Sequence, residues 1–283
     1  DIDGVNLDAV TTATIDAKSP TFLLEELRKR YAELELPDDF NMQNNLCENI
    51  EFIFGPPGTG KTTHLARNIL IPMMQDNREC KVLVLTPTNK AADVLAKRII
   101  EVSGSDISYA DWLVRFGGTG DEEIERSSIF KDKTFDIRTL AKNVTVTTIA
   151  RFSYDFFMPH GVRVFLHGIN WDYIVIDEAS MISIADIVFP LYKKTPRKFI
   201  IAGDPFQIEP VTSIDLWKNE NIYTMVGLDS FANPKTKPRQ YKVELLTTQY
   251  RSVPVIGDIF SKFAYGGILK HYREASSQRP LNV

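Results

Sequence analysis

Cysteine is scarce in this chain of 283 residues, and long hydrophobic runs and an excess of positive charge are missing from it. Its two cysteines, Cys47 and Cys80, have no metal-ligand spacing, which argues against a disulfide framework or a zinc site; we interpret both as small buried or incidental residues. The apolar runs reach only the length of short strands, and the N-terminus has no basic region or apolar signal core. We therefore expect no membrane partner and a cytoplasmic or other intracellular setting.

The acidic residues slightly outnumber the basic ones, 37 to 33, which gives a net charge of −4. This balance argues against a protein that binds nucleic acid through its overall charge, although a local basic groove is still compatible with it. The apolar fraction of 43% is that of a globular protein with a sizeable core. The chain lacks an initial Met and ends abruptly at Val283, so we expect a piece of a longer polypeptide.

From residue 50 onward, short apolar strands alternate with amphipathic helices. This alternation is typical of an α/β fold in which helices cover both faces of a parallel sheet. The pattern predicts strands at 51–54, 81–86, 143–147, 173–177 and 198–202, and helices at 61–74, 89–102, 181–189 and 254–264.

Three other segments break this alternation. Residues 1–45 are expected to form an N-terminal extension with a helix that begins at Ser19-Pro20. Residues 104–142, rich in glycine and acidic side chains, are expected to form a small insertion subdomain that divides the main domain into 46–103 and 143–283. Residues 212–242 are expected to form a loop or hairpin, in which the basic stretch 233–239 either contacts nucleic acid or forms a solvated turn.

A glycine-rich stretch lies between the first predicted strand and the helix after it. Glycines let backbone N–H groups turn toward phosphate oxygens, and the helix adds its positive N-terminal end. Lys61 would reach the β- and γ-phosphates of a nucleoside triphosphate, and the Thr62 hydroxyl would bind Mg²⁺. A glycine-rich turn without a ligand is the alternative. We predict a phosphate-binding P-loop made of Gly55, Pro56, Pro57, Gly58, Thr59, Gly60, Lys61, Thr62 and Thr63.

Two adjacent carboxylates, Asp177 and Glu178, end another apolar strand. This position is the carboxyl edge of a parallel sheet, where ligands bind. We expect Asp177 to hold Mg²⁺, and Glu178 to orient and deprotonate an attacking water. The alternative is that such a pair of carboxylates caps a helix or forms a surface ion pair. The predicted P-loop upstream favours the metal-binding and catalytic interpretation over this alternative.

Two further strand ends carry candidate nucleotide contacts. Gln207 follows the turn 203–205, and its neutral amide can both donate and accept, which suits sensing the γ-phosphate and the lytic water. An incidental glutamine in a turn is the alternative. Tyr250 and Arg251 end a later apolar segment; the planar guanidinium suits phosphate oxygens, and the tyrosine face suits a base.

Hydroxyl-bearing segments follow two more predicted strands, at 86–90 and 144–148. Hydroxyl groups and a helix N-terminus can contact a sugar–phosphate chain without reading its bases. Polar caps of loops are the alternative. The candidate nucleic-acid contacts are Pro87, Thr88, Asn89 and Thr148.

Taken in order, six motifs resemble those of the superfamily 1 helicases. They occupy residues 55–62, 86–92, 144–148, 176–180, 203–207 and 249–252. Tyr265-Gly266-Gly267, followed by Leu269, is similar to the segment after the Gln-Tyr-Arg motif in the subgroup of the nonsense-mediated-decay helicase and the Okazaki-fragment nuclease-helicase. The resemblance covers about residues 40 to 270.

This resemblance implies a P-loop NTPase fold with a RecA-like domain that binds ATP and Mg²⁺. It implies that Gln43, twelve residues before Gly55, contacts adenine, although Asn44 and Asn45 are equally polar neighbours. It also implies that single-stranded nucleic acid runs past Thr88, Asn89 and Thr148. The implied catalytic and metal contacts are Lys61, Thr62, Asp177, Glu178, Gln207, Tyr250 and Arg251.

The chain also departs from the family pattern. Ser252 stands where members commonly have Met, and 208–210 reads Ile-Glu-Pro in place of Leu-Pro-Pro. The family's second RecA-like domain, with its second arginine, has no match here. We therefore expect the full-length protein to translocate on a single strand and unwind duplexes, and residues 1–283 to bind ATP–Mg²⁺ with very slow hydrolysis. The alternatives are a P-loop switch or regulatory module without unwinding activity, and a non-catalytic scaffold. DNA and RNA both stay open as the strand.

Overall fold

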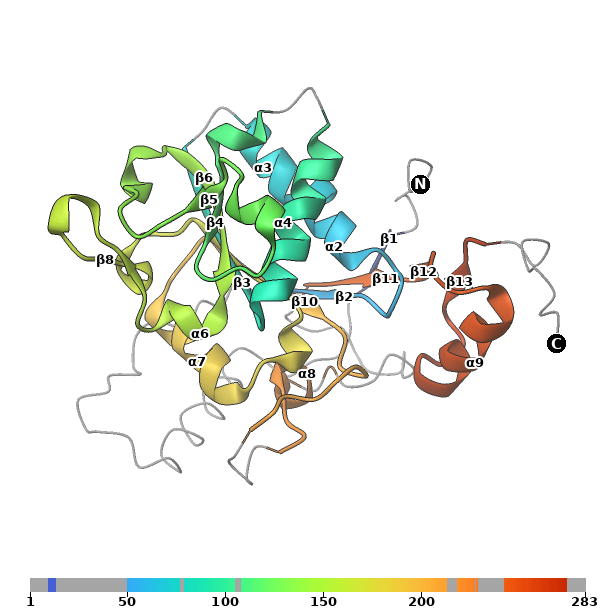
Figure 1. Cartoon of the computed structure of the whole chain (residues 1–283). Helices are drawn as coiled ribbons and strands as arrows, with labels where there is room; N and C mark the ends of the chain where they lie inside the picture. Colours follow the sequence, from blue (N-terminus) through green and yellow to red (C-terminus); the bar gives the residue numbers. More distant parts are fainter. Residues whose placement is uncertain are drawn as a thin grey trace.

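A nine-stranded sheet dominates the described part of the chain (Figure 1). The computed structural model describes residues 10–13, 50–76, 79–104, 108–212, 218–226, 228 and 242–273. The strands of the sheet, in spatial order, are β1 (Val10–Ala13), β11 (Lys242–Leu246), β2 (Ile50–Phe54), β10 (Lys198–Gly203), β9 (Tyr173–Ile176), β3 (Cys80–Thr86), β6 (Lys142–Thr148), β4 (Leu113–Phe116) and β5 (Phe130–Lys131).

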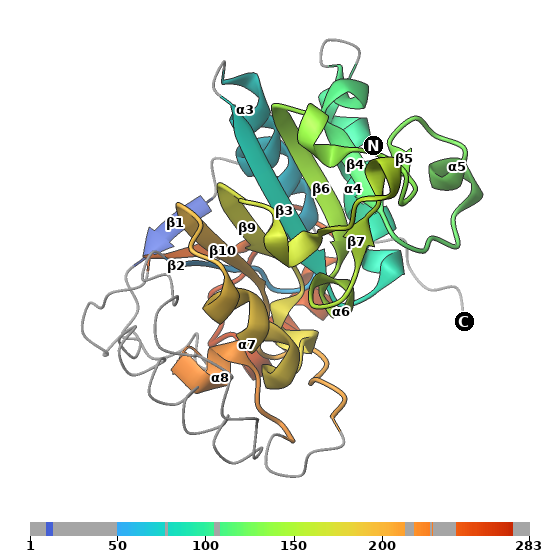
Figure 2. The same cartoon turned by 90° about the vertical axis from the view of Figure 1, so that its left-hand side faces the viewer.

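Every neighbouring pair in this sheet is parallel except β1 with β11. Figure 2 shows β3, β6, β9 and β10 side by side. Parallel strands bring their carboxyl ends to one edge, so the loops that follow β2, β3, β6, β9 and β10 gather there. The predicted α/β fold with a mainly parallel sheet is confirmed.

Helices cover both faces of the sheet, as predicted (Figure 1). Successive side chains of a strand point to opposite faces, so Val82 and Val84 of β3 join one core, whereas Leu83 and Leu85 join the other. One face carries α2 (Lys61–His64), the π-helical turn η2 (Leu65–Leu70), α3 (Ile71–Gln75) and α4 (Asn89–Ser103). The other face carries α6 (Ile149–Phe152), α7 (Ile184–Lys193) and α8 (Ile222–Val226).

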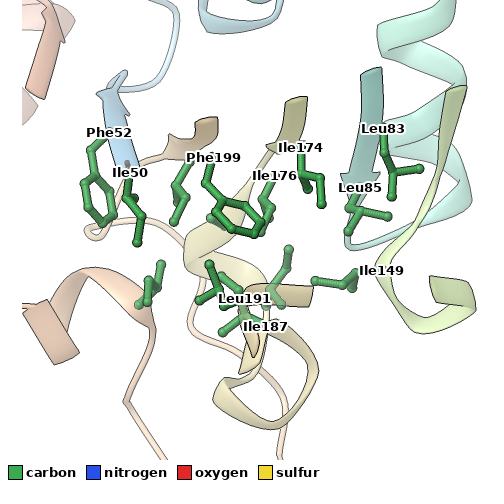
Figure 3. Packing of buried hydrophobic residues seen from close by; sticks show 14 of the residues in the cluster. Ile50, Phe52, Leu83, Leu85, Ile149, Ile174, Ile176, Ile187, Leu191 and Phe199 are labelled. Carbon is green, nitrogen blue, oxygen red and sulfur yellow. The ribbon is translucent and has the colours of Figure 1, made fainter. Parts of the chain in front are cut away.

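Figure 3 shows the second of these cores, in which labelled side chains of β2, β3, β9 and β10 lie near those of α6 and α7. Ile174, Ile176 and Phe199 from the central strands lie opposite Ile187 and Leu191 of α7, and all five are buried. Each such side chain contributes about 1.5–3 kcal/mol when it leaves water. This packing holds rigid the strand ends that carry Asp177 and Gly203.

The helix predicted at 181–189 begins three residues later in the structure. Residues Ala179–Met181 form a separate 3-10 turn, η7, and Ser183 caps α7 by accepting a hydrogen bond from the Asp186 N–H at 3.2 Å. The predicted helix near 254–264 is α9 (Pro254–Ala264), and proline at its first position suits a helix start.

The segments outside the main alternation contribute more strands than expected. β1 of the N-terminal extension pairs with β11, and β4 and β5 of the segment 104–142 continue the sheet beyond β6. The segment 212–242 contains α8. The predicted N-terminal helix and the basic stretch 233–239 lie outside the described residues. The boundaries of the proposed insertion subdomain stay a prediction.

Short elements complete the described part of the chain. They are α5 (Glu122–Glu125), the strand pairs β7 (Phe156–Phe157) with β8 (Val164–Phe165) and β12 (Thr248–Gln249) with β13 (Lys270–His271), and the 3-10 turns η3 (Tyr109–Asp111), η4 (Ile137–Thr139), η5 (Pro159–Gly161) and η6 (Leu166–Gly168). Among the described helices, none combines the length and the apolar character that crossing a membrane requires.

Candidate functional site

The predicted P-loop joins β2 to α2 at the carboxyl edge of the sheet. Gly58 and Gly60 have φ angles of 78° and 79°, a left-handed conformation that side-chain-bearing residues rarely adopt. Thr59 closes the loop on itself, because its hydroxyl donates to the Pro56 carbonyl at 2.7 Å. The hydroxyl of Thr59 is therefore engaged in the loop and does not line the cavity.

Two neighbouring segments hold the loop in place. The Gly55 N–H donates to the Gly203 carbonyl at the end of β10, at 3.0 Å. The Tyr250 N–H donates to the Gly58 carbonyl at 2.8 Å. The loop is thus tied to the strand ends that carry Gln207 and Arg251, both of which the sequence predicts to contact the nucleotide.

Gly58→Ala is expected to destabilise the protein more than Gly60→Ala. Both substitutions place a side chain at a positive φ, which costs about 1–2 kcal/mol. A Cβ at position 58 would also lie 2.8 Å from Cβ of Arg251, whereas a Cβ at position 60 meets nothing within 4 Å. Urea unfolding of both variants measures the difference, and equal losses of unfolding free energy would show that Arg251 does not pack against the loop.

Lys61 and Glu178 form an ion pair across the site, with Nζ 2.6 Å from Oε2. Glu178 also has a left-handed backbone, with φ 52° and ψ 40°, which costs about 1–3 kcal/mol for a residue other than glycine. Such strain persists where the surrounding structure enforces it, as at catalytic sites. The two predicted catalytic groups therefore meet directly.

Asp177 is buried behind this ion pair. Its N–H donates to the Leu85 carbonyl at 2.9 Å, which holds the end of β9 against β3. Burial raises the pKa of Asp177 to about 6, although the Lys61 ammonium counteracts the rise; the Glu178 carboxylate adds to it. A buried carboxylate whose charged form is disfavoured fits a divalent cation, which would stabilise that form. Asp177 and the hydroxyl of Thr62 are the oxygen donors that would hold Mg²⁺ here.

A cavity of about 570 Å³ lies over the P-loop, within the size range of ligand-binding pockets. It brings together most of the predicted nucleotide-binding residues, which come from four separate segments of the chain. The predicted residues that line it are Gly55, Pro56, Pro57, Gly58, Gly60, Lys61, Thr62, Thr63, Glu178, Gln207, Tyr250 and Arg251. Gln43, the predicted adenine contact, lies outside the described residues.

Four residues that line the cavity were not predicted from the sequence. Val94 and Arg98 reach the cavity from α4, where a spacing of four residues places them on one helical face. Tyr272 and Arg273 line it after β13. The Tyr272 ring lies 5.1 Å from that of Tyr250, because parallel pairing of β12 with β13 brings the two segments together. The only sequence signal was a second tyrosine–arginine pair like that at 250–251.

The predicted nucleic-acid contacts lie at the ends of β3 and β6. The register pairs Thr86 with Thr148, so the two strand ends are adjacent. Thr88 caps α4, because its hydroxyl accepts a hydrogen bond from the Ala91 N–H at 3.1 Å. This is the polar cap that the sequence offered as the alternative to a nucleic-acid contact. Asn89 is exposed, whereas Thr148 is buried. The path of a strand along these residues stays a prediction.

A buried arginine, which the sequence did not predict as a site residue, lies beside these contacts. Arg115 lies within β4, and its Nε is 2.7 Å from Oδ1 of Asp93 on α4. Its guanidinium also donates to the Gly118 carbonyl at 2.7 Å and contacts Asn89 at 3.4 Å. Arg115 therefore fixes the loop after β4 against the N-terminus of α4. The signal was an arginine inside an otherwise apolar strand.

Comparison with known proteins places the chain in a family. A family model described as an AAA domain matches residues 41–213, more than half of the chain. The probable RNA helicase armi of Drosophila melanogaster is 23% identical over 80% of this chain and 22% of its own length. The RecD subunit of the RecBCD enzyme of Buchnera aphidicola is 30% identical over 61% of this chain and 25% of its own length.

The human RNA helicase Mov10l1 is 31% identical over 58% of this chain and 13% of its own length. The chain thus spans a quarter or less of the length of these three relatives. The match to the family model includes the P-loop, the Asp177-Glu178 pair and Gln207. The chain belongs to this AAA domain family, and the matched region covers most of what the motifs predict to be the first RecA-like domain of a superfamily 1 helicase.

Proposed function

We propose that this chain is the ATP-binding half of a helicase motor that acts on single-stranded nucleic acid. The observation that carries the proposal is the meeting of Lys61, Glu178, Gln207 and Arg251 around one cavity of about 570 Å³. Phosphoryl transfer to water uses groups of these kinds. Two cations bind phosphate oxygens, a carboxylate acts as the base for the water, and a neutral amide positions it.

The Lys61–Glu178 ion pair suggests how binding prepares the base. Triphosphate oxygens would draw the Lys61 ammonium away from Glu178, since they present more negative charge than one carboxylate. Glu178, freed from its partner, would then accept a proton from the attacking water. Mg²⁺, held by Thr62 and Asp177, would neutralise charge on the β- and γ-phosphates.

Arg251 and Tyr250 would bind opposite ends of the nucleotide. Both line the cavity, and the hydrogen bond from the Tyr250 N–H to Gly58 holds their turn against the P-loop. We assign the Arg251 guanidinium to the γ-phosphate and the Tyr250 ring to the base, where the Tyr272 ring beside it widens the stacking surface.

The nucleic-acid side of the proposal rests on the ends of β3 and β6. Pro87, Thr88, Asn89 and Thr148 lie on the same edge of the sheet as the nucleotide cavity, which would couple a bound strand to ATP. A second RecA-like domain of the full-length protein would close over the cavity with another arginine. An arginine supplied in this way accelerates comparable phosphoryl transfers by about 10³–10⁵, so residues 1–283 alone would bind ATP–Mg²⁺ and turn it over very slowly.

Strand separation tests this proposal. The full-length protein is expected to unwind a duplex with a single-stranded overhang only when ATP and Mg²⁺ are present, and residues 1–283 are expected to separate no strands. Both proteins are compared on DNA and RNA duplexes that carry a fluorophore and a quencher. Strand separation by residues 1–283 would contradict the need for a second domain, and its absence in the full-length protein on every substrate would contradict the helicase function.

A further inference from the structure

Tyr265 is the first residue of the segment Tyr265-Gly266-Gly267, whose sequence predicts no role in binding or catalysis. It follows α9, which ends in a tight turn: the N–H groups of Tyr265 and Gly267 both donate to the Ser261 carbonyl at 2.9 Å. Gly266 and Gly267 have φ angles of 60° and 77°, which is why glycine is required at this helix end. The turn directs Tyr265 into the domain, where it is 3% exposed.

The Tyr265 hydroxyl reaches Asp204, the residue that follows β10. It donates to Oδ2 of Asp204 at 2.6 Å. Burial, and then the hydrogen bond to Asp204, raise the pKa of Tyr265, so the phenol keeps its proton and acts as the donor. Asp204 itself is fully buried, so its carboxylate depends on such donors for compensation.

Gln207 shares the same carboxylate oxygen. Its Nε2 donates to Oδ2 of Asp204 at 3.1 Å, and its backbone N–H donates to the Asp204 carbonyl at 3.1 Å. A carboxylate oxygen accepts hydrogen bonds only, so the amide must turn its nitrogen toward Asp204. The amide oxygen of Gln207 is left without a hydrogen bond within the described residues, and Gln207 lines the nucleotide cavity.

We infer that Tyr265 and Asp204 are positioning residues that hold the Gln207 amide with its oxygen available to the attacking water. This inference rests on the proposed function and deepens it. Gln207 then accepts one hydrogen of the water while Glu178 accepts the other, so both acceptors fix the direction of attack. Because α9 begins just after Arg251, one element connects the turn of Arg251 to the orientation of Gln207.

Tyr265→Phe tests the inference, because it removes the hydroxyl and keeps the ring that packs on Phe206 and Phe260, 5.5 and 6.3 Å away. In the full-length protein with saturating single strand, kcat is expected to fall about tenfold, as the loss of one hydrogen bond to a charged group predicts. The KM for ATP is expected to change by less than about twofold, since the contact acts on the water. Tyr109→Phe, which removes a hydroxyl on the α4 side of the sheet, is the matched control and should leave kcat unchanged.

A double-variant cycle separates positioning from a general structural effect. In a Gln207→Ala background, Tyr265→Phe is expected to lower kcat by less than about twofold, because Tyr265 acts through the missing amide. Asp204→Asn provides a second variant with the same expected dependence on Gln207, should Tyr265→Phe fold poorly. A tenfold loss that persists without Gln207, or an unchanged kcat in the single variants, would overturn the inference. Absence of ATP turnover in the parent protein would instead overturn the proposed function.

Discussion

Glu178→Gln is expected to abolish ATP turnover in the full-length protein while ATP still binds. Removal of a general base typically costs about 10²–10⁴ in rate. The substitution changes little else: glutamine has the same size and can keep the left-handed backbone at this position. A neutral amide also competes less for the Lys61 ammonium than the carboxylate 2.6 Å away does. We therefore expect ATP affinity to be equal or higher.

Two measurements check this prediction: steady-state ATP hydrolysis, and the binding of a fluorescent ATP analogue. Glu125→Gln is the matched control, because Glu125 is exposed on α5, away from the cavity. Turnover by Glu178→Gln close to that of the parent would remove Glu178 from the mechanism. A loss of nucleotide binding in the same variant would instead give Glu178 a structural role.

Lys61→Ala is expected to lose nucleotide affinity in residues 1–283 as well as in the full-length protein. A hydrogen bond from an ammonium to a phosphate oxygen contributes about 1.5–3 kcal/mol, which corresponds to about a tenfold to hundredfold rise in Kd. The substitution also leaves the Glu178 carboxylate without its partner beside the phosphates, and its repulsion adds to the loss.

Titration with a fluorescent ATP analogue measures this Kd. Lys262→Ala, at an exposed position on α9, is the matched control and should bind as the parent does. Thermal unfolding without nucleotide checks that Lys61→Ala is folded. If the folded variant binds the analogue as tightly as the parent, the cavity over the P-loop is not the nucleotide site.

The elements that carry the chemistry could be predicted because their signals are local. The P-loop, the strand that ends in Asp177 and the strand that leads to Gln207 each combine a short apolar run with polar residues directly after it. Parallel pairing then brings such strand ends to one edge without further information. This is why the structure brings Lys61, Glu178 and Gln207 together around one cavity, while their roles stay a prediction.

The other parts of the fold and of the candidate site could not be predicted, because they depend on contacts between segments that are distant in the sequence. β1 and β5 are short strands whose place in the sheet is set by their partners, β11 and β4. Tyr272 reaches the cavity only because β13 pairs with β12. The Tyr265–Asp204–Gln207 chain likewise joins α9 to the loop after β10, and no spacing in the sequence encodes that contact.

The measurement that tests the central claim most directly is ATP turnover by the full-length protein during titration with a single-stranded oligonucleotide, using DNA and RNA in parallel. In the proposed helicase motor, the nucleotide cavity and the strand path share one edge of the sheet. We therefore expect ATP turnover to rise with the oligonucleotide concentration and then to saturate. Glu178→Gln should show no such rise. Turnover that stays constant with both oligonucleotides would contradict the motor, and would favour a P-loop switch without unwinding activity.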